Sequence, residues 1–335
     1  MTLLIHSPRP MSRSPLKTRS RPIKTAKNQK RWFGLGLMAA VMVFSLFLQG
    51  TQAEWFSSDL KVWVLDVGQG DAIFIQTPEG EQILVDSGNP GTVLAKLGQV
   101  MPPWDRTIDK VIVTHPHADH EGGLPEILRR YQVTTIYETG VLGYDDMQYQ
   151  VTELAAEQGT EIILSSNGVL PSSSPRWGRV GLHPPKSGEG GESAQLELRI
   201  IAPDSNLHNK KIDNLNSASI VLLLTYGDTS ILLTGDATNE EESDFLSDLS
   251  EPIDILKVAH HGSVTSTSQK FLEIAAPRFA IFSVGADNDY GHPHPVTLER
   301  LYSRDIEIFR TDLDGDVLIT SDGGEPVVES RPLPF

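Results

Sequence analysis

Hydrophobic residues near the middle of the first hundred positions fall into three short runs, at 61–67, 72–76 and 82–86. Glycine- or proline-containing stretches separate the runs, and Pro78-Glu79-Gly80 has the composition of a hairpin turn. Short apolar runs bounded by such turns are typical of β-strands. We therefore expect the folded region to begin with an antiparallel meander.

Strand and helix patterns alternate along the rest of the chain. We expect helices at 92–100, 146–158, 240–249 and 295–304. We expect strands at 110–113, 135–137, 161–164, 196–201, 220–224, 230–234, 253–258 and 279–284, and a last strand at 316–319. Several of these strands lead directly into His, Asp or Asn residues. Polar side chains at strand ends are typical of a functional site in a mixed α/β fold.

Residues 165–194 interrupt this alternation. The segment is rich in Ser, Pro and Gly and has few large apolar side chains. Because such a segment can bury little surface, we expect a flexible insertion within a domain spanning 59–325. It would form either a lid over the site or a tolerated surface loop.

The region before this domain has a basic part and an apolar part. Residues 1–31 contain nine Lys or Arg and no acidic residue, and 32–48 are apolar without charge. As a helix, the apolar run would span about 25 Å, near the lower limit for crossing a bilayer. We expect a disordered basic arm, then a transmembrane anchor or signal segment over 32–53, with a buried core helix as the alternative. Basic residues before the apolar run favour an extracytoplasmic domain in the cell envelope, tethered or secreted after cleavage.

Composition narrows the chemistry. The chain has no cysteine, which excludes disulfides and thiolate ligands. Outside the basic arm, 19 basic residues face 44 acidic ones, a formal charge of −25. The domain therefore shows no strong basic surface of the kind that nucleic acids commonly bind.

The most informative segment follows the expected strand at 110–113. It places His115, His117, Asp119 and His120 within six positions, ahead of Gly122-Gly123 and a short helix pattern. Imidazole and carboxylate groups are ligands for zinc, and also for manganese or iron. A His-rich surface loop is the alternative, but four ligand-type residues at this spacing favour a metal site.

These residues form the motif H-x-H-x-D-H, and the chain here resembles the metallo-β-lactamase fold hydrolases. Other motifs resemble the hydrolase domain of ComEC-type DNA-internalisation (competence) proteins: D-V-G-Q-G-D-A at 66–72, I-L-V-D-S-G at 83–88, L-L-T-G-D at 232–236, K-V-A-H-H-G-S at 257–263 and G-H-P-H-P at 291–295. The resemblance runs from about residue 60 to 319. It implies a four-layer αββα sandwich, which periodicity alone does not predict.

The resemblance also implies two divalent metal ions, zinc or manganese. His115 and His117 would bind the first ion, Asp119 and His120 the second, and Asp236 would bridge them. A metal-bound hydroxide would then act as the nucleophile, with Asp119 also orienting it. Asp86 would support the ligand loop through hydrogen bonds.

Two ligand positions stay open. Where the resembled fold has a third histidine for the first ion, this chain offers Asn216 or Asn214. For the last ligand of the second ion, His260, His261 and His292 are all candidates, and one of the three, such as His261, would be a general acid. Ser263 and Tyr290 are candidate substrate contacts.

Three functions remain compatible with the sequence. The first is an exported, metal-dependent phosphodiesterase or nuclease that acts on a small-molecule or nucleic-acid phosphodiester, including DNA. The second is hydrolysis of a lactam, lactone, thioester or small phosphate ester. The third is a non-catalytic, metal-stabilised binding module of the envelope.

Overall fold

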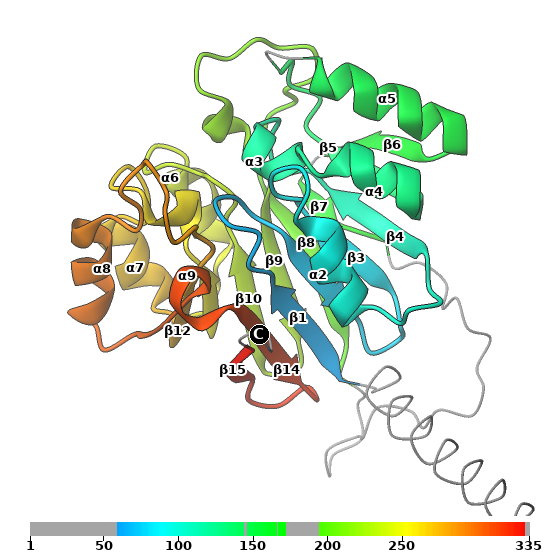
Figure 1. The fold of residues 1–335 in the computed structure, drawn as a ribbon. Helices are drawn as coiled ribbons and strands as arrows, with labels where there is room; N and C mark the ends of the chain where they lie inside the picture. The colour runs from blue at the N-terminus through cyan, green and yellow to red at the C-terminus, as the bar shows by residue number, and fades with distance from the viewer. Residues whose placement is uncertain (1–58, 144–145, 166, 172–193, 332–335) are drawn as a thin grey trace, which may run out of the picture. The chain divides into compact units, whose positions relative to one another are not determined.

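The computed structural model describes residues 59–143, 146–165, 167–171 and 194–331 (Figure 1). The predicted basic arm, the apolar segment at 32–53 and most of the predicted insertion lie outside these ranges. Within the described part of the chain, no helix combines the length and apolar character that crossing a bilayer requires.

The strands form two sheets. In the first, the order is β15-β14-β1-β2-β3-β4-β5-β6, antiparallel up to β3 and parallel from β3 to β6. Its strands are β1 (Leu60–Val64), β2 (Ile73–Gln76), β3 (Gln82–Val85), β4 (Thr107–Ile112), β5 (Gln132–Glu138), β6 (Glu161–Leu164), β14 (Asp316–Ser321) and β15 (Val327–Arg331). The expected meander is thus β1 to β3.

The second sheet has the order β13-β12-β11-β10-β9-β8-β7, parallel from β13 to β10 and antiparallel from β10 to β7. Its strands are β7 (Gly168–Val169), β8 (Leu196–Ala202), β9 (Val221–Tyr226), β10 (Thr229–Leu233), β11 (Ile255–Lys257), β12 (Phe279–Phe282) and β13 (Glu307–Arg310). Both sheets therefore have a parallel part whose strands end toward the same region.

Helices and short helical turns connect many of the strands, including the parallel ones. They are α2 (Val93–Val100), α3 (Ala118–Glu121), α4 (Leu124–Arg130), α5 (Met147–Gln158), α6 (Glu242–Phe245), α7 (Gln269–Ala275), α8 (Pro295–Tyr302) and α9 (Thr311–Asp314), with 3-10 turns η1 (Leu215–Ala218), η2 (Leu246–Asp248) and η3 (Ala259–Gly262). Local signals fix several ends. Ser268 accepts a hydrogen bond from the Phe271 N–H at the start of α7, and Gly159 ends α5 with a left-handed φ of 75°.

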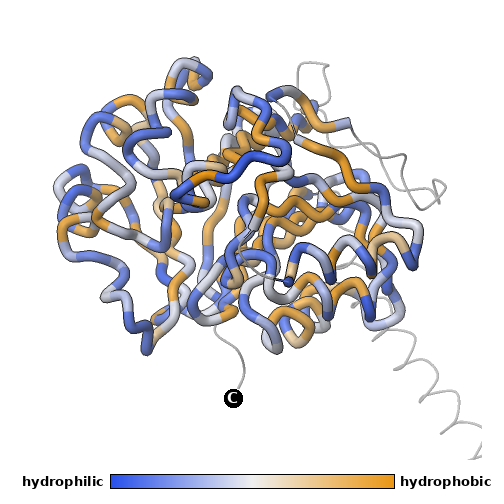
Figure 2. Tube along the Cα trace, turned by 90° about the horizontal axis from the view of Figure 1, so that it is seen from above, coloured by the Kyte–Doolittle hydropathy of each residue, from blue (hydrophilic) through white to orange (hydrophobic). Residues whose placement is uncertain are grey.

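Successive side chains of the strands pack on opposite faces of each sheet, and this arrangement determines the layers of the fold. Val62 and Val64 pack into the cluster shared by both sheets, whereas Trp63 and Leu65 pack on the other face beside residues of α2, α4 and α5. The outer face of the second sheet packs in the same way on α6, α7 and α8. Because successive side chains of a strand point to opposite faces, each sheet buries both of its faces. The result is the expected four-layer αββα sandwich, with apolar strands at its centre (Figures 1 and 2).

The structure differs from the sequence expectations at four places. Residues 168–169 form strand β7, and Leu170 is buried in the core, so the flexible insertion does not start at 165. The helix expected at 240–249 is shortened to α6 and η2. Strand β13 was not expected. Strand β15 follows the supposed last strand and carries the domain to residue 331, past 325. Short amphipathic edge strands have weak periodicity, so their pairing partners decide them.

Candidate metal centre

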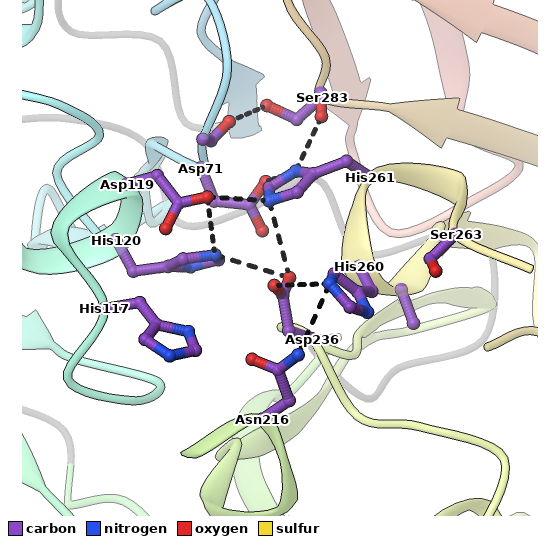
Figure 3. Close-up of polar contacts among 12 residues, drawn as sticks. Asp71, His117, Asp119, His120, Asn216, Asp236, His260, His261, Ser263 and Ser283 are labelled. Atoms are coloured by element: carbon purple, nitrogen blue, oxygen red, sulfur yellow. Dashed lines mark hydrogen bonds and ion pairs between the residues drawn. The ribbon is translucent and has the colours of Figure 1, made fainter. Parts of the chain in front are cut away.

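The His-rich segment begins where β4 ends. His117 has an extended backbone and precedes α3, whose first turn carries Asp119 and His120. The change from strand to helix therefore turns side chains from neighbouring positions toward one region. Figure 3 shows Asp119 and His120 pointing toward Asp236 and His261, which come from the second half of the chain.

Asp86 anchors this segment from behind. Its Oδ1 accepts the Thr114 N–H at 2.8 Å, and its Oδ2 accepts the Thr114 hydroxyl at 2.7 Å. The same Oδ2 lies 2.8 Å from Nδ1 of His120, and both side chains are buried. A carboxylate at Nδ1 keeps the imidazole proton on that nitrogen, so Nε2 of His120 carries the lone pair. Asp86 therefore contacts both the end of the strand and the ring of His120.

His115 and His117 form a second pair of imidazoles. Nε2 of His115 lies 2.9 Å from Nδ1 of His117, and the two rings meet edge to face. Nδ1 of His115 is 3.1 Å from the Thr114 hydroxyl and 3.4 Å from the Ser219 hydroxyl. These contacts direct one nitrogen of each ring toward the same point.

Asp236 lies between two groups of histidines. Its Oδ1 is 3.3 Å from Nε2 of His120 and 3.6 Å from Nε2 of His261. Its Oδ2 is 3.9 Å from Nε2 of His115 and 3.8 Å from Nε2 of His260. The two oxygens of one buried carboxylate therefore face two separate sets of ring nitrogens.

His260 and His261 diverge because of their backbone. Both have left-handed conformations in η3, with φ of 49° and 51°, and their ring planes differ by 69°. Nε2 of His261 lies 3.3 Å from Oδ2 of Asp119. Nε2 of His260 lies 3.3 Å from the side-chain amide of Asn216. Adjacent histidines thus reach opposite sides of Asp236.

Asn216 is also placed at the cluster. It is buried in η1, and its Oδ1 has no hydrogen-bond partner among the described residues. Asn214 instead caps η1 by accepting the Asn216 N–H. Of the two asparagines considered from the sequence, Asn216 is therefore the one at the histidines.

His292, Tyr290 and Ser263 lie further out. The ring of His292 is 5.6 Å from that of His260 and 6.4 Å from that of His261, and Tyr290 stacks on it with 71% of its surface exposed. The Ser263 hydroxyl is 3.0 Å from that of Thr265. Among the three candidate histidines for the last ligand, His261 has the contacts to both Asp119 and Asp236.

Sequence reasoning missed two buried charges beside His261. Asp71 lies between β1 and β2, and its carboxylate forms an ion pair with Lys257 at the end of β11. Oδ1 of Asp71 also lies 3.4 Å from Nδ1 of His261. Both residues belong to motifs quoted above, and the lysine at the end of an apolar strand is a signal that could have identified the pair.

The nearby carboxylates give the histidines two kinds of pKa shift. Burial lowers the pKa of His115, His117 and His260, so these rings are neutral near neutral pH. Burial alone would also lower the pKa of His120, but Asp236 and Asp86 raise it well above its usual value. Against the same effect of burial, Asp236, Asp119 and Asp71 raise the pKa of His261 to about 9.

The donor set fits divalent cations. Single ligand atoms of His115, His120 and Asp236 lie within 4.8 Å of one another, as do those of Asp119, His120 and His261. Nε2 of His120 and of His261 and Oδ1 of Asp236 are buried and have no hydrogen-bond partner within the described ranges. Buried polar atoms without partners, aimed at a common point, are expected at a metal site.

Comparison with known proteins agrees with this geometry. The family description "Metallo-beta-lactamase superfamily" matches residues 65–285, which is more than half of the chain. The chain belongs to the metallo-β-lactamase superfamily. The αββα fold is that of this superfamily of hydrolases, and membership of it implies the binding of divalent metal.

The resemblance to ComEC-type competence proteins is also confirmed. The chain is 27% identical to ComE operon protein 3 of Bacillus subtilis (84% of this chain, 35% of the relative). It is 30% identical to Recombination protein 2 of Haemophilus influenzae (85% and 31%) and 27% identical to Competence protein ComA of Neisseria gonorrhoeae (84% and 35%). The chain thus spans about a third of the length of these relatives.

Proposed function

We propose that this chain is a hydrolase of phosphodiesters that uses two divalent cations, zinc or manganese. The observation that carries the proposal is the position of Asp236, whose two oxygens face two different sets of imidazole nitrogens. A carboxylate shared in this way is suited to hold two cations close together. Divalent cations bound there would activate water near neutral pH and stabilise the negative charge that develops on a phosphate.

The two halves of the domain contribute different ligands to each cation. For the first we assign His115, His117, Oδ2 of Asp236 and the amide oxygen of Asn216. For the second we assign Asp119, His120, His261 and Oδ1 of Asp236. An amide oxygen is a harder ligand than imidazole, which favours manganese or loosely bound zinc at the first position.

The remaining polar groups are assigned to the substrate. The Asp119 side chain is 29% exposed, so it can orient the attacking water as well as bind a cation. Nδ1 of His261 faces the Ser283 carbonyl, and its buried Nε2 points toward Asp119 and Asp236, so we assign His261 as a ligand through Nε2 rather than as the general acid considered from the sequence. His260 and His292 are partly exposed and adjacent, and we assign to them contact with the leaving-group oxygen.

The substrate class rests on the relatives, two of whose names refer to recombination and to competence. These names make DNA the nucleic acid to test. The acidic domain does not supply the basic surface on which nucleic-acid affinity usually depends. The proposal therefore specifies the phosphodiester bond rather than tight binding of a long nucleic acid.

For the whole chain we also propose an extracytoplasmic location at the cell envelope, through residues 32–53. An alkaline phosphatase fusion after residue 335 tests this. Phosphatase activity in intact cells supports the orientation, and activity restricted to lysed cells contradicts it.

The activity is tested with protein loaded with Zn²⁺ or Mn²⁺ on bis(p-nitrophenyl) phosphate and end-labelled single-stranded DNA. We expect hydrolysis that falls roughly 10²-fold or more in Asp119→Ala, with an unchanged circular dichroism spectrum. Glu153→Gln, an exposed change on α5, is the matched control. Nitrocefin, a lactone and a thioester are run beside them.

Other results of these assays would support one of the alternative functions or a different site. Turnover of only the lactam, lactone or thioester would move the assignment to that class. Bound metal without turnover of any substrate would favour the non-catalytic binding module. Equal activity in Asp119→Ala would place the activity outside this site.

A further inference from the structure

The buried charges behind His261 have no role in the proposed reaction as described above. Lys257 and Asp71 are 1% exposed, and they are 186 positions apart in the sequence. Burying two charges is costly, and such a pair contributes little net stability compared with apolar residues of the same size. Its position beside a candidate ligand points to a second purpose.

Asp71 contacts the segment that carries Asp119 and also the side chain of His261, two of the ligands assigned to the second cation. Its backbone N–H donates to the Asp119 carbonyl at 3.0 Å, and its own carbonyl accepts the Gly88 N–H at 2.7 Å. Its side chain lies against His261, which comes from the second half of the domain. The residue therefore joins the segment that carries Asp119 to the one that carries His261.

The contacts at Nδ1 of His261 determine where its proton lies. Nδ1 is 2.9 Å from the Ser283 carbonyl oxygen and 3.4 Å from Oδ1 of Asp71. Both groups are acceptors, so the ring holds its proton on Nδ1. Nε2 then presents a lone pair toward Asp119 and Asp236, as a metal ligand must.

Lys257 holds this carboxylate in place. Its ammonium group pairs with Oδ2 of Asp71, the oxygen that does not face His261. Its backbone is fixed in β11, where it pairs with β10, and its carbonyl accepts the Thr234 hydroxyl at 2.7 Å. The lysine thus ties the carboxylate to the strand that leads directly into His260 and His261.

We propose that the Asp71–Lys257 pair is a positioning device for the second cation. It holds His261 in the orientation and tautomer that bind metal, and it sets the separation between the ligands of the two halves. The inference rests on the proposed metal site. It assigns to Asp71 and Lys257 the role of positioning a ligand.

The test compares two double variants of the full chain. Asp71→Leu/Lys257→Met replaces the ion pair by apolar groups and removes the carboxylate contact at Nδ1 of His261, where the Ser283 carbonyl remains. Asp71→Asn/Lys257→Met removes the same charges but keeps an acceptor oxygen. Stepwise Zn²⁺ affinities are measured by competition with a chromophoric chelator, and thermal melting reports the fold.

We expect both variants to fold and to bind the first Zn²⁺ as the wild type does. The leucine variant should bind the second Zn²⁺ about 10–100-fold more weakly. The asparagine variant should recover most of that loss. Lys96→Met/Asp316→Asn, which removes another buried pair between α2 and β14, should leave both affinities unchanged.

The outcomes distinguish failure of the proposed function from failure of the positioning role. A wild-type protein that binds no Zn²⁺ overturns the proposed function and this inference with it. Two ions bound equally well by the wild type and the leucine variant overturn the inference alone. Equal losses in the leucine and asparagine variants also overturn it, because the side-chain oxygen at position 71 would then be irrelevant to His261. A leucine variant that does not fold leaves the comparison of the wild type with the asparagine variant, where a loss above tenfold contradicts the inference.

Discussion

The contact between Asp86 and His120 can be tested with Asp86→Asn, which keeps the size of the side chain but replaces the oxygen at Nδ1 of His120 and at the Thr114 hydroxyl by an amide NH2 group. In Asp86→Asn, the amide oxygen can keep the hydrogen bond from the Thr114 N–H, now 2.8 Å from Oδ1. The amide nitrogen then faces Nδ1 of His120, which the carboxylate contacts at 2.8 Å. Asp86 has a φ of 58°, a left-handed conformation that asparagine also tolerates, so the backbone should not move.

The new amide places a donor opposite the Nδ1–H of His120. The ring can move its proton to Nε2, which removes the lone pair needed for metal, or keep it on Nδ1 without an acceptor. A buried donor without a partner costs about 1–3 kcal/mol. Since 1.4 kcal/mol corresponds to about tenfold in an equilibrium constant, the second cation should bind about 5- to 150-fold more weakly.

The assay is the stepwise Zn²⁺ titration, with thermal melting to check the fold. Asp254→Asn is the matched control, because Oδ2 of Asp254 also accepts a backbone N–H and a hydroxyl, both from Ser230 at 2.9 Å, but contacts no histidine among the described residues. The first affinity should stay constant in both variants, and the second should fall only in Asp86→Asn. Equal second affinities in Asp86→Asn and the wild type would refute the tautomer argument.

Three further predictions follow from the same site. Gly70 has a φ of 128°, and a Cβ there would lie 2.2 Å from the Asp119 carbonyl oxygen, so Gly70→Ala should lower the melting temperature and weaken the second cation; an unchanged melt would contradict this. Because the pKa of His261 is raised to about 9 and that of His120 is also raised, metal binding at pH 7 should release protons. The affinity should then increase with pH and level off near pH 9, and calorimetry in two buffers of different ionisation enthalpy should give different heats; equal heats would exclude this coupling. Finally, chelation should lower the melting temperature in proportion to the metal affinity lost, and a melt insensitive to both chelator and added Zn²⁺ would argue against binding in the folded state.

The individual motifs could be read from the sequence because their chemistry is local. The residue types and spacing of His115, His117, Asp119 and His120 identify a metal-binding segment in any fold that presents a strand followed by a loop. The strands with strong apolar patterns, such as those leading to Asp86 and Asp236, were also predicted, since their periodicity reflects burial on a sheet.

The choice among His260, His261 and His292 could not be made in the same way. All three follow strands of the second sheet, and spacing alone does not favour one of them. The left-handed backbone of η3 sends His260 and His261 to opposite sides of Asp236, and His292 lies beyond them. Backbone conformations of this kind depend on packing with distant residues, which a local pattern does not contain.

The sequence by itself determined which side chains can bind metal and which segments are buried strands, because both depend on residue type and short-range order. Only the tertiary structure decided that Asp71 lies between Lys257 and His261, and which oxygen of Asp236, the bridge implied by the resemblance, faces which histidine nitrogen. These contacts join residues more than a hundred positions apart, and they form only when the two sheets pack face to face.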